Sequence, residues 1–288
     1  MAPETALDRH PWNAGFDVTV PDTPPTTISA AQREACGREG YFVMENVLEP
    51  ELLAALTAEL DVVEAGVDQF LGTQEGGRFT IAEQGAITFS PHAVLSSAAA
   101  RTVARHRTMV GLARDLLGPD VNLYWDQAVY KKPGTESPFP WHQDNGYAFV
   151  EPQQYLTCWV ALTDATEENG CPWVVPGLHR LGTLAHAYSD TGFVCLHDPE
   201  RAVAVPASAG SIVVFSSLTP HSTGPNRTDA VRKAYIVQFA PTGAAVLRRG
   251  PDGAATRVTA DDESRQYEVL RAGARVTPPV LTPEAGSP

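Results

Sequence analysis

A histidine and an aspartate two positions apart mark the most informative segment of the chain, WHQDNGY at residues 141–147. On an extended strand, side chains at positions i and i+2 point to the same face, so His142 and Asp144 can converge on one metal ion. A third ligand must come from elsewhere, and His221 in SLTPHSTGPN is the best candidate. Two histidines and one carboxylate form the ligand set of oxygen-activating non-haem Fe(II) enzymes.

Strand-like sequence surrounds both parts of this motif, which on its own has little specificity. The run YLTCWVAL follows the first part, and Asn169-Gly170 then predicts a tight turn. The run SIVVFSS precedes His221, and Arg232 stands 11 residues after it at the start of another predicted strand. We expect strand pairing to bring this arginine beside the metal.

The elements that must position these residues change in character near Pro119. Before it, the sequence predicts a short helix over residues 30–40, a strand over 41–48, a helix from Pro50 to about Glu64 and another over roughly 96–117. After it, short runs rich in β-branched and aromatic residues alternate with turn residues. The pattern predicts a mostly β fold with flanking helices, built on a double-stranded β-helix of the jelly-roll, cupin-like type.

The chain divides into one large domain and two flanking segments. Residues 1–27 are rich in proline and lack apolar periodicity, so we expect a mobile N-terminal arm. Residues 28–242 form the single predicted domain. Residues 243–288 are expected to be a C-terminal extension that packs on or trails the domain, with one short strand near Arg257 and Val258.

Composition excludes several classes of protein. A formal net charge of −13 argues against binding to nucleic acid or to an anionic membrane. The four cysteines show no CxxC spacing, and no signal peptide or long apolar stretch occurs. We therefore expect a cytoplasmic monomer or homodimer that acts on a small molecule.

The two motif blocks together resemble the phytanoyl-CoA dioxygenase family of Fe(II)/2-oxoglutarate-dependent oxygenases, over roughly residues 30–242. The resemblance rests on WHQDNGYAFVEPQQYLTCWVALTDATEENGCPWVVPGLHR and PHSTGPNRTDAVRKAYIVQFA, with their HxD, ENG and PGxH elements, a distal histidine and a following arginine. It implies that His142, Asp144 and His221 are iron ligands. It also implies that Arg232 binds the distal carboxylate of 2-oxoglutarate, a role for which the planar guanidinium is well suited.

Further contacts with 2-oxoglutarate follow from the same resemblance. Thr223 would donate its hydroxyl to the distal carboxylate. Trp159 would pack against the cosubstrate, although a tryptophan of the core is the competing interpretation. Gln127 would reach the cosubstrate from the opposite wall.

Two further residues near Gln127, Tyr130 and Lys132, could assist it. Strand alternation places Gln127 and Val129 on one face and Ala128, Tyr130 and Lys132 on the other, so both sets cannot face the site without a bulge. We favour Gln127.

Three aromatic residues could border the substrate pocket, or could simply pack in the β core: Tyr147, Phe149 and Trp173. The remaining histidines are expected to be structural, and His179 to shape a turn. Substrate selectivity is expected to depend on the segments 72–90, 147–154 and 179–197, because loops over a rigid barrel carry specificity.

The family's chemistry implies an enzyme that uses Fe(II), 2-oxoglutarate and O2, releases succinate and CO2, and hydroxylates an unactivated C–H bond of a small molecule, expected to be a secondary-metabolite intermediate. The presence of the Asp144 carboxylate argues against chlorination. Desaturation, epimerisation, cyclisation and endoperoxidation remain alternatives. Two other classes stay open: a cupin-like enzyme that needs no 2-oxoglutarate, and a non-catalytic ligand-binding jelly roll.

Overall fold

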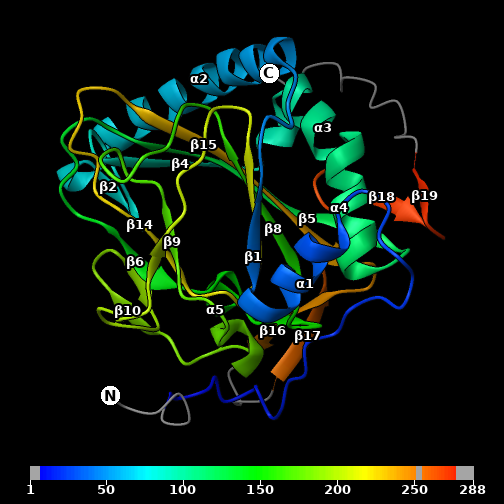
Figure 1. Cartoon of the computed structure of the whole chain (residues 1–288). Coiled ribbons are helices and arrows are strands. Elements are labelled where there is room, and N and C mark those ends of the chain that lie inside the picture. The colour runs from blue at the N-terminus through cyan, green and yellow to red at the C-terminus, as the bar shows by residue number, and fades with distance from the viewer. Residues whose placement is uncertain (1–6, 251–254, 277–288) are drawn as a thin grey trace.

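Two antiparallel sheets face each other in the computed structural model, which describes residues 7–250 and 255–276 (Figure 1). The large sheet has the order β1 (Tyr41–Met44), β13 (Ile212–Ser216), β8 (Leu156–Ala161), β15 (Arg232–Pro241), β5 (Val121–Lys131), β4 (Ile87–Pro91), β3 (Ala82–Glu83) and β2 (Arg78–Phe79). The small sheet has the order β12 (Val203–Ala204), β9 (Pro172–Val174), β14 (His221–Thr223) and β6 (Phe139–His142). This arrangement confirms the predicted mostly β, jelly-roll class.

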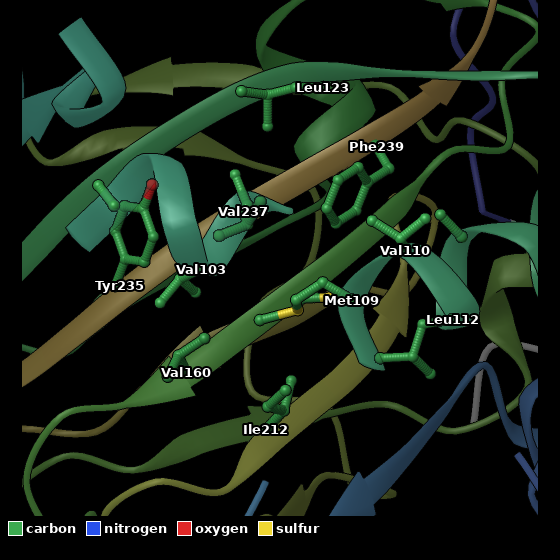
Figure 2. Packing of buried hydrophobic residues seen from close by; sticks show 14 of the residues in the cluster. Val103, Met109, Val110, Leu112, Leu123, Val160, Ile212, Tyr235, Val237 and Phe239 are labelled. Carbon is green, nitrogen blue, oxygen red and sulfur yellow. The ribbon is translucent and has the colours of Figure 1, made fainter. Parts of the chain in front are cut away.

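Helices cover the outer face of the large sheet (Figure 1). They are α1 (Ala30–Glu39), α2 (Pro50–Gly72), α3 (Ala98–Ala104) and α4 (Arg107–Leu117). Figure 2 shows Met109, Val110 and Leu112 of α4 facing Val160 of β8 and Phe239 of β15, all within one buried hydrophobic cluster. Burial of such side chains contributes roughly 1.5–3 kcal/mol each, which fixes the helices on this face.

Strand alternation separates the helix side of the large sheet from its inner side. On β15, Tyr235 and Val237 belong to the cluster under the helices, whereas Ala234 and Ile236 belong to a second cluster between the two sheets. The inner side is therefore the one that faces the small sheet. Any site built between the sheets takes its residues from alternate positions of β5, β8 and β15.

The two predicted long helices differ from the observed ones at their ends. The helix expected to stop near Glu64 continues to Gly72. The helix expected over residues 96–117 is broken into α3 and α4, because His106 is extended (φ −57°, ψ 141°) and caps α4, its Nδ1 accepting from the Thr108 N–H at 3.3 Å. Histidine is not among the residues that usually mark a helix start, so the break was not predicted.

The N-terminal segment follows the surface of the domain rather than standing free of it. His10 donates its backbone N–H to the Thr183 carbonyl at 2.9 Å, and the backbone N–H groups of residues 26–28 all bond to Oδ2 of buried Asp115 at 2.6–3.2 Å. The expected mobile arm is thus replaced, for residues 7–27, by a docked segment. Residues 1–6 lie outside the described residues.

The C-terminal extension packs on the domain as far as residue 276. The strand β16 (Ala245–Arg249) pairs with β7 (Val150–Glu151) and with β17 (Ala255–Thr259), which contains the predicted strand at Arg257 and Val258. After it, β18 (Glu268–Arg271) joins β5 and pairs with β19 (Ala274–Arg275). In the part of the chain that the structure describes, no helix has the length and apolar character needed to cross a membrane.

Candidate active site

The two histidines of the motif are brought together by direct pairing of neighbouring strands of the small sheet. His142 ends β6, His221 begins β14, and the two are register partners. Their ring centroids lie 4.1 Å apart, and both side chains are buried. Side chains directly opposite on paired strands share one face, so the two imidazoles converge although 79 residues separate them.

Asp144 completes the group, but not from a strand as expected. The strand ends at His142, Gln143 is still extended (φ −110°, ψ 144°), and Asp144 begins the short helix α5 (Asp144–Tyr147). Because the extended backbone persists through Gln143, the carboxylate still returns to the histidine side. Its Oδ1 lies 3.7 Å from His221 Nε2, and one ligand atom from each of the three residues lies within 4.8 Å of the others.

Hydrogen bonds fix each of these side chains with a free atom directed at the others. The Nδ1–H groups of His142 and His221 donate to the carbonyls of Pro140 (2.8 Å) and Thr219 (3.0 Å), so the Nε2 atom of each ring is the one directed at the other side chains. Thr157 on β8 donates to Asp144 Oδ2 at 2.5 Å, which leaves Oδ1. Burial, followed by the neighbouring His221, lowers the pKa of His142 well below its ordinary value, so it stays a neutral ligand. Thr157 was not found by sequence reasoning.

The segment between the ligands is held by Gln143, another residue that sequence reasoning missed. Its fully buried amide donates to the carbonyls of Gly182 (3.0 Å) and Leu218 (2.6 Å) and accepts from the Leu184 N–H (2.7 Å). The glycine of the motif is required for packing, because a Cβ at Gly146 would lie 2.1 Å from the His186 ring.

A narrow cavity of about 60 Å³ between the sheets joins this group to Arg232. Arg232 starts β15 on the inner side and is 1% exposed, yet only its Nη1 has a partner, a weak contact of 3.5 Å with the Val129 carbonyl. Its Nε and Nη2 have no hydrogen-bond partner. Burial lowers the pKa of Arg232 to about 10, so it remains a cation at neutral pH. A buried cation with two free donors beside a metal site fits a carboxylate.

Lys131 is a further basic residue beside Arg232 that sequence reasoning missed, and burial, followed by the neighbouring Arg232, lowers its pKa to about 6. It is the register partner of Arg232 on β5 and is fully buried. Its Nζ donates to Thr223 Oγ1 (3.1 Å), to the Thr223 carbonyl (3.2 Å) and to the Gly224 carbonyl (2.5 Å). Since Lys131 donates to the Thr223 oxygen, the hydroxyl hydrogen of Thr223 is left to point elsewhere, and Thr223 lines the cavity.

The remaining predicted cosubstrate residues fall on the two sides of the large sheet. Gln127 and Trp159 line the cavity, and the Trp159 ring lies 5.4 Å from the Arg232 guanidinium carbon. Tyr130 and Lys132 instead face α2, where Tyr130 donates to Asp61 (2.7 Å) and Lys132 pairs with Glu64 (2.5 Å). No bulge reverses this alternation near Gln127, because the only register shift between β15 and β5 lies between Gln238 and Phe239.

A second cavity, of about 300 Å³, lies beside the same histidine and aspartate side chains. It shares five lining residues with the first: Phe89, Gln127, Phe139, His142 and Asp144. Its other lining residues, most of them aromatic, are Ile81, Tyr124, Trp125, Tyr147, Ala148, Tyr155 and Gln238.

Only one of the three residues expected at the substrate pocket lines this cavity. Tyr147 does so, with its ring 5.3 Å from that of His142. Phe149 is turned toward the N-terminal segment, where its ring lies 4.7 Å from His10 and 5.7 Å from Trp12. Trp173 lies on β9 opposite Ser222 and packs against the core between the sheets. Neither Phe149 nor Trp173 belongs to the lining of either cavity.

Comparison with known proteins agrees with this geometry. The family model described as phytanoyl-CoA dioxygenase matches residues 37–234. The chain belongs to the phytanoyl-CoA dioxygenase family. It is therefore an enzyme of the 2-oxoglutarate-dependent dioxygenase class, which uses iron, 2-oxoglutarate and O2.

The individual relatives have low sequence identity to this chain. An ectoine dioxygenase of Nocardia farcinica is 25% identical over 82% of this chain and 87% of its own length. A phytanoyl-CoA dioxygenase of Arabidopsis thaliana is 28% identical, but the match spans 37% of this chain and 40% of that protein. Among solved structures, the epimerase SnoN in complex with Fe3+, alpha ketoglutarate and nogalamycin RO is 25% identical with a TM-score of 0.60, over 86% of this chain and 94% of that one. EctD from S. alaskensis, 22% identical, has the same fold with a TM-score of 0.65, over 85% and 89% of the two chains.

Proposed function

We propose that this dioxygenase hydroxylates an unactivated C–H bond of a small molecule, expected to be an intermediate of secondary metabolism. In this proposal His142, Asp144 and His221 bind the iron, and Arg232 binds the distal carboxylate of 2-oxoglutarate. One observation carries it: the three ligands stand where a cavity closed by a buried, unpaired arginine meets a second cavity lined by aromatic rings. The likeness to SnoN, whose structure contains nogalamycin, supports a natural-product substrate.

The residues present fit both groups that the family implies. Three ligand atoms on one side of a metal leave further coordination positions open, unlike a closed structural site. The two free donors of Arg232 match the two oxygens of a carboxylate, and Thr223 offers a hydroxyl beside them. When bound, iron and 2-oxoglutarate supply the oxidation of a C–H bond, with succinate and CO2 as co-products.

The protein's own part in this chemistry is positioning and exclusion of water. The carbonyls of Pro140 and Thr219 orient the two imidazoles, and Thr157 orients the Asp144 carboxylate. Trp159 and the Arg232 side chain line the first cavity. The aromatic lining of the second cavity would hold the target carbon close to the metal ligands. A dry, rigid site limits side reactions of the oxidant.

The choice of hydroxylation rests on the presence of Asp144. A carboxylate at this position occupies the place that a halide would need, so chlorination is disfavoured. The mass of the product distinguishes the remaining outcomes: hydroxylation adds one oxygen atom, desaturation or cyclisation removes two hydrogens, epimerisation leaves the mass unchanged and endoperoxidation adds two oxygens.

A spectroscopic titration tests the assignment of the site. Anaerobic addition of Fe(II) and 2-oxoglutarate to the wild-type protein should give a visible metal-to-ligand charge-transfer band. His221→Ala should abolish this band, and His197→Ala should retain it, because His197 is exposed and far from the motif in sequence. Absence of the band from the wild-type protein would favour a non-catalytic binder. A band that persists in His221→Ala would refute the ligand assignment.

A screen for succinate formation against candidate metabolites then identifies the substrate. Substrate-dependent succinate with an oxidised product supports the proposal. Oxidation of a substrate without 2-oxoglutarate would instead indicate a cupin-like enzyme of another class.

A further inference from the structure

The second cavity carries almost no charge. Its lining contains no lysine or arginine, and Asp144 is the one carboxylate in it. The neighbouring arginines lie outside this lining: Arg232 belongs to the adjoining cavity, where it is assigned to 2-oxoglutarate, and Arg265 pairs with Asp262 at 2.7 Å. An anionic substrate would therefore lose its hydration without gaining a counter-charge, which is a large penalty.

A cationic substrate would also bind weakly, because both oxygens of Asp144 already have other contacts. Its Oδ2 accepts from Thr157, and its Oδ1 is directed at the metal position beside His221. No other carboxylate lines the cavity. A substrate ammonium would have aromatic faces to contact but no free anion with which to pair.

Neutral polar groups in the cavity, in contrast, are free to bind. Gln127, Tyr124 and Tyr155 line it, and within the described residues none of their side-chain polar groups has a hydrogen-bond partner. Burial raises the pKa of Tyr124 to about 12, so its hydroxyl remains a neutral donor. Polar groups that line a cavity without a protein partner are available to bond to a ligand.

The shape of the lining favours flat rings. Six aromatic side chains surround the space: Phe89, Phe139, Tyr124, Trp125, Tyr147 and Tyr155. Tyr124 and Tyr155 are already in edge contact with each other at 5.1 Å, as are Tyr147 and His142 at 5.3 Å. Aromatic walls bind a planar ring by stacking or edge contact, with about 0.5–1.5 kcal/mol per pair beyond simple burial.

We infer that the substrate is an uncharged molecule with a planar aromatic ring system and hydroxyl or carbonyl groups, which bond to Gln127, Tyr124 and Tyr155. The inference rests on the proposed function, because it assumes that this cavity holds the molecule to be oxidised. It excludes phosphonates and carboxylates as the portion that lies next to the metal position.

Three naphthalene probes that share one ring system and differ in the charge of their substituent test the inference. Anaerobic calorimetric titrations of the full chain loaded with Fe(II) and 2-oxoglutarate, at neutral pH, compare 2-naphthol, 2-naphthoate and 2-naphthylmethylammonium. We expect 2-naphthol to bind about tenfold more tightly than either ion, because each ion is desolvated without a partner. Equal or tighter binding of an ion, or no binding of 2-naphthol, would overturn the inference.

Variants locate the binding. Ala148→Trp fills the cavity and should abolish 2-naphthol binding, whereas Ala54→Trp on the exposed side of α2 should leave it intact. Tyr124→Phe and Gln127→Leu are milder changes, and each should weaken 2-naphthol binding about fivefold through one lost hydrogen bond. If all three cavity variants bind like the wild type, the ligand lies elsewhere and the inference fails.

The charge-transfer experiment on the same preparation separates the two proposals. A band without preference for 2-naphthol refutes the substrate class alone. A preference for 2-naphthol without a band refutes the proposed function and leaves the character of the cavity established.

Discussion

Replacing Arg232 by methionine should move cosubstrate affinity and stability of the ligand-free protein in opposite directions. Two nitrogens of the guanidinium, Nε and Nη2, have no hydrogen-bond partner among the residues that the structure describes. A hydrogen bond to a charged group contributes about 1.5–3 kcal/mol, so loss of two to a carboxylate costs at least about 3 kcal/mol, or roughly a hundredfold in 2-oxoglutarate affinity.

Without 2-oxoglutarate, the same guanidinium destabilises the folded protein. Burial lowers its pKa from 12.5 to about 10, and one unit corresponds to about 1.4 kcal/mol, so the charged form carries a penalty of roughly 3 kcal/mol. Below pH 10 the group is charged in both the folded and the unfolded chain, and the whole penalty applies. After allowance for lost packing on Trp159, we expect Arg232→Met to raise the free energy of unfolding by about 1–2 kcal/mol.

Calorimetry with 2-oxoglutarate and urea unfolding of the ligand-free protein measure the two effects. The matched control is Lys233→Met, because Lys233 is the next residue on β15 but pairs with Asp61 on the helix side at 2.7 Å. It should leave 2-oxoglutarate affinity unchanged and lower stability by less than about 1 kcal/mol. The reasoning is refuted if Arg232→Met binds 2-oxoglutarate like the wild type, or if it is less stable than the control.

Three further changes test the supporting structure. Thr157→Val removes the hydrogen bond to Asp144, and calorimetry should show Fe(II) or Co(II) affinity reduced about tenfold; unchanged affinity would remove Thr157 from the site. Asp115→Ala leaves the N–H groups of residues 26–28 without their acceptor and should lower the free energy of urea unfolding by about 2–4 kcal/mol, against a smaller loss for Asp115→Asn. Burial raises the pKa of Asp126 to about 6, so the folded state binds more protons than the unfolded chain between pH 3.8 and about 6. The free energy of unfolding should therefore fall as pH rises through that window. Asp126→Asn should flatten this pH dependence in urea unfolding, and a slope that persists in the variant would assign it to another group.

The pairing of His142 with Asp144 and the fold class were predictable because their signals are local. His142 and Asp144 are neighbours in sequence, and the extended backbone through Gln143 preserves the convergence even though Asp144 begins a helix. Alternation along β5 correctly separated Gln127 from Tyr130 and Lys132. The same period of two would have placed Lys131 on the inner side, so that signal was present and unused.

Contacts between distant segments explain what the sequence did not reveal. Whether Phe149 faces the substrate or His10 depends on where the N-terminal segment docks, and nothing near Phe149 in the sequence specifies that. Tyr124 and Tyr155 read as ordinary strand residues until the sheets are assembled and place both at one cavity. Thr157 becomes significant only when Asp144 is seen to lie beside it.

The two sheets contribute different parts of the proposed site, and this division has a mechanical consequence. His142, His221 and Thr223 stand on the small sheet, whereas Arg232, Gln127 and Trp159 stand on the large one. A 2-oxoglutarate molecule held at both ends therefore acts as a crosslink across the sandwich. Because the reaction consumes that crosslink, we expect the two layers to be most firmly joined just before oxidation and to loosen once in every cycle, when the products leave.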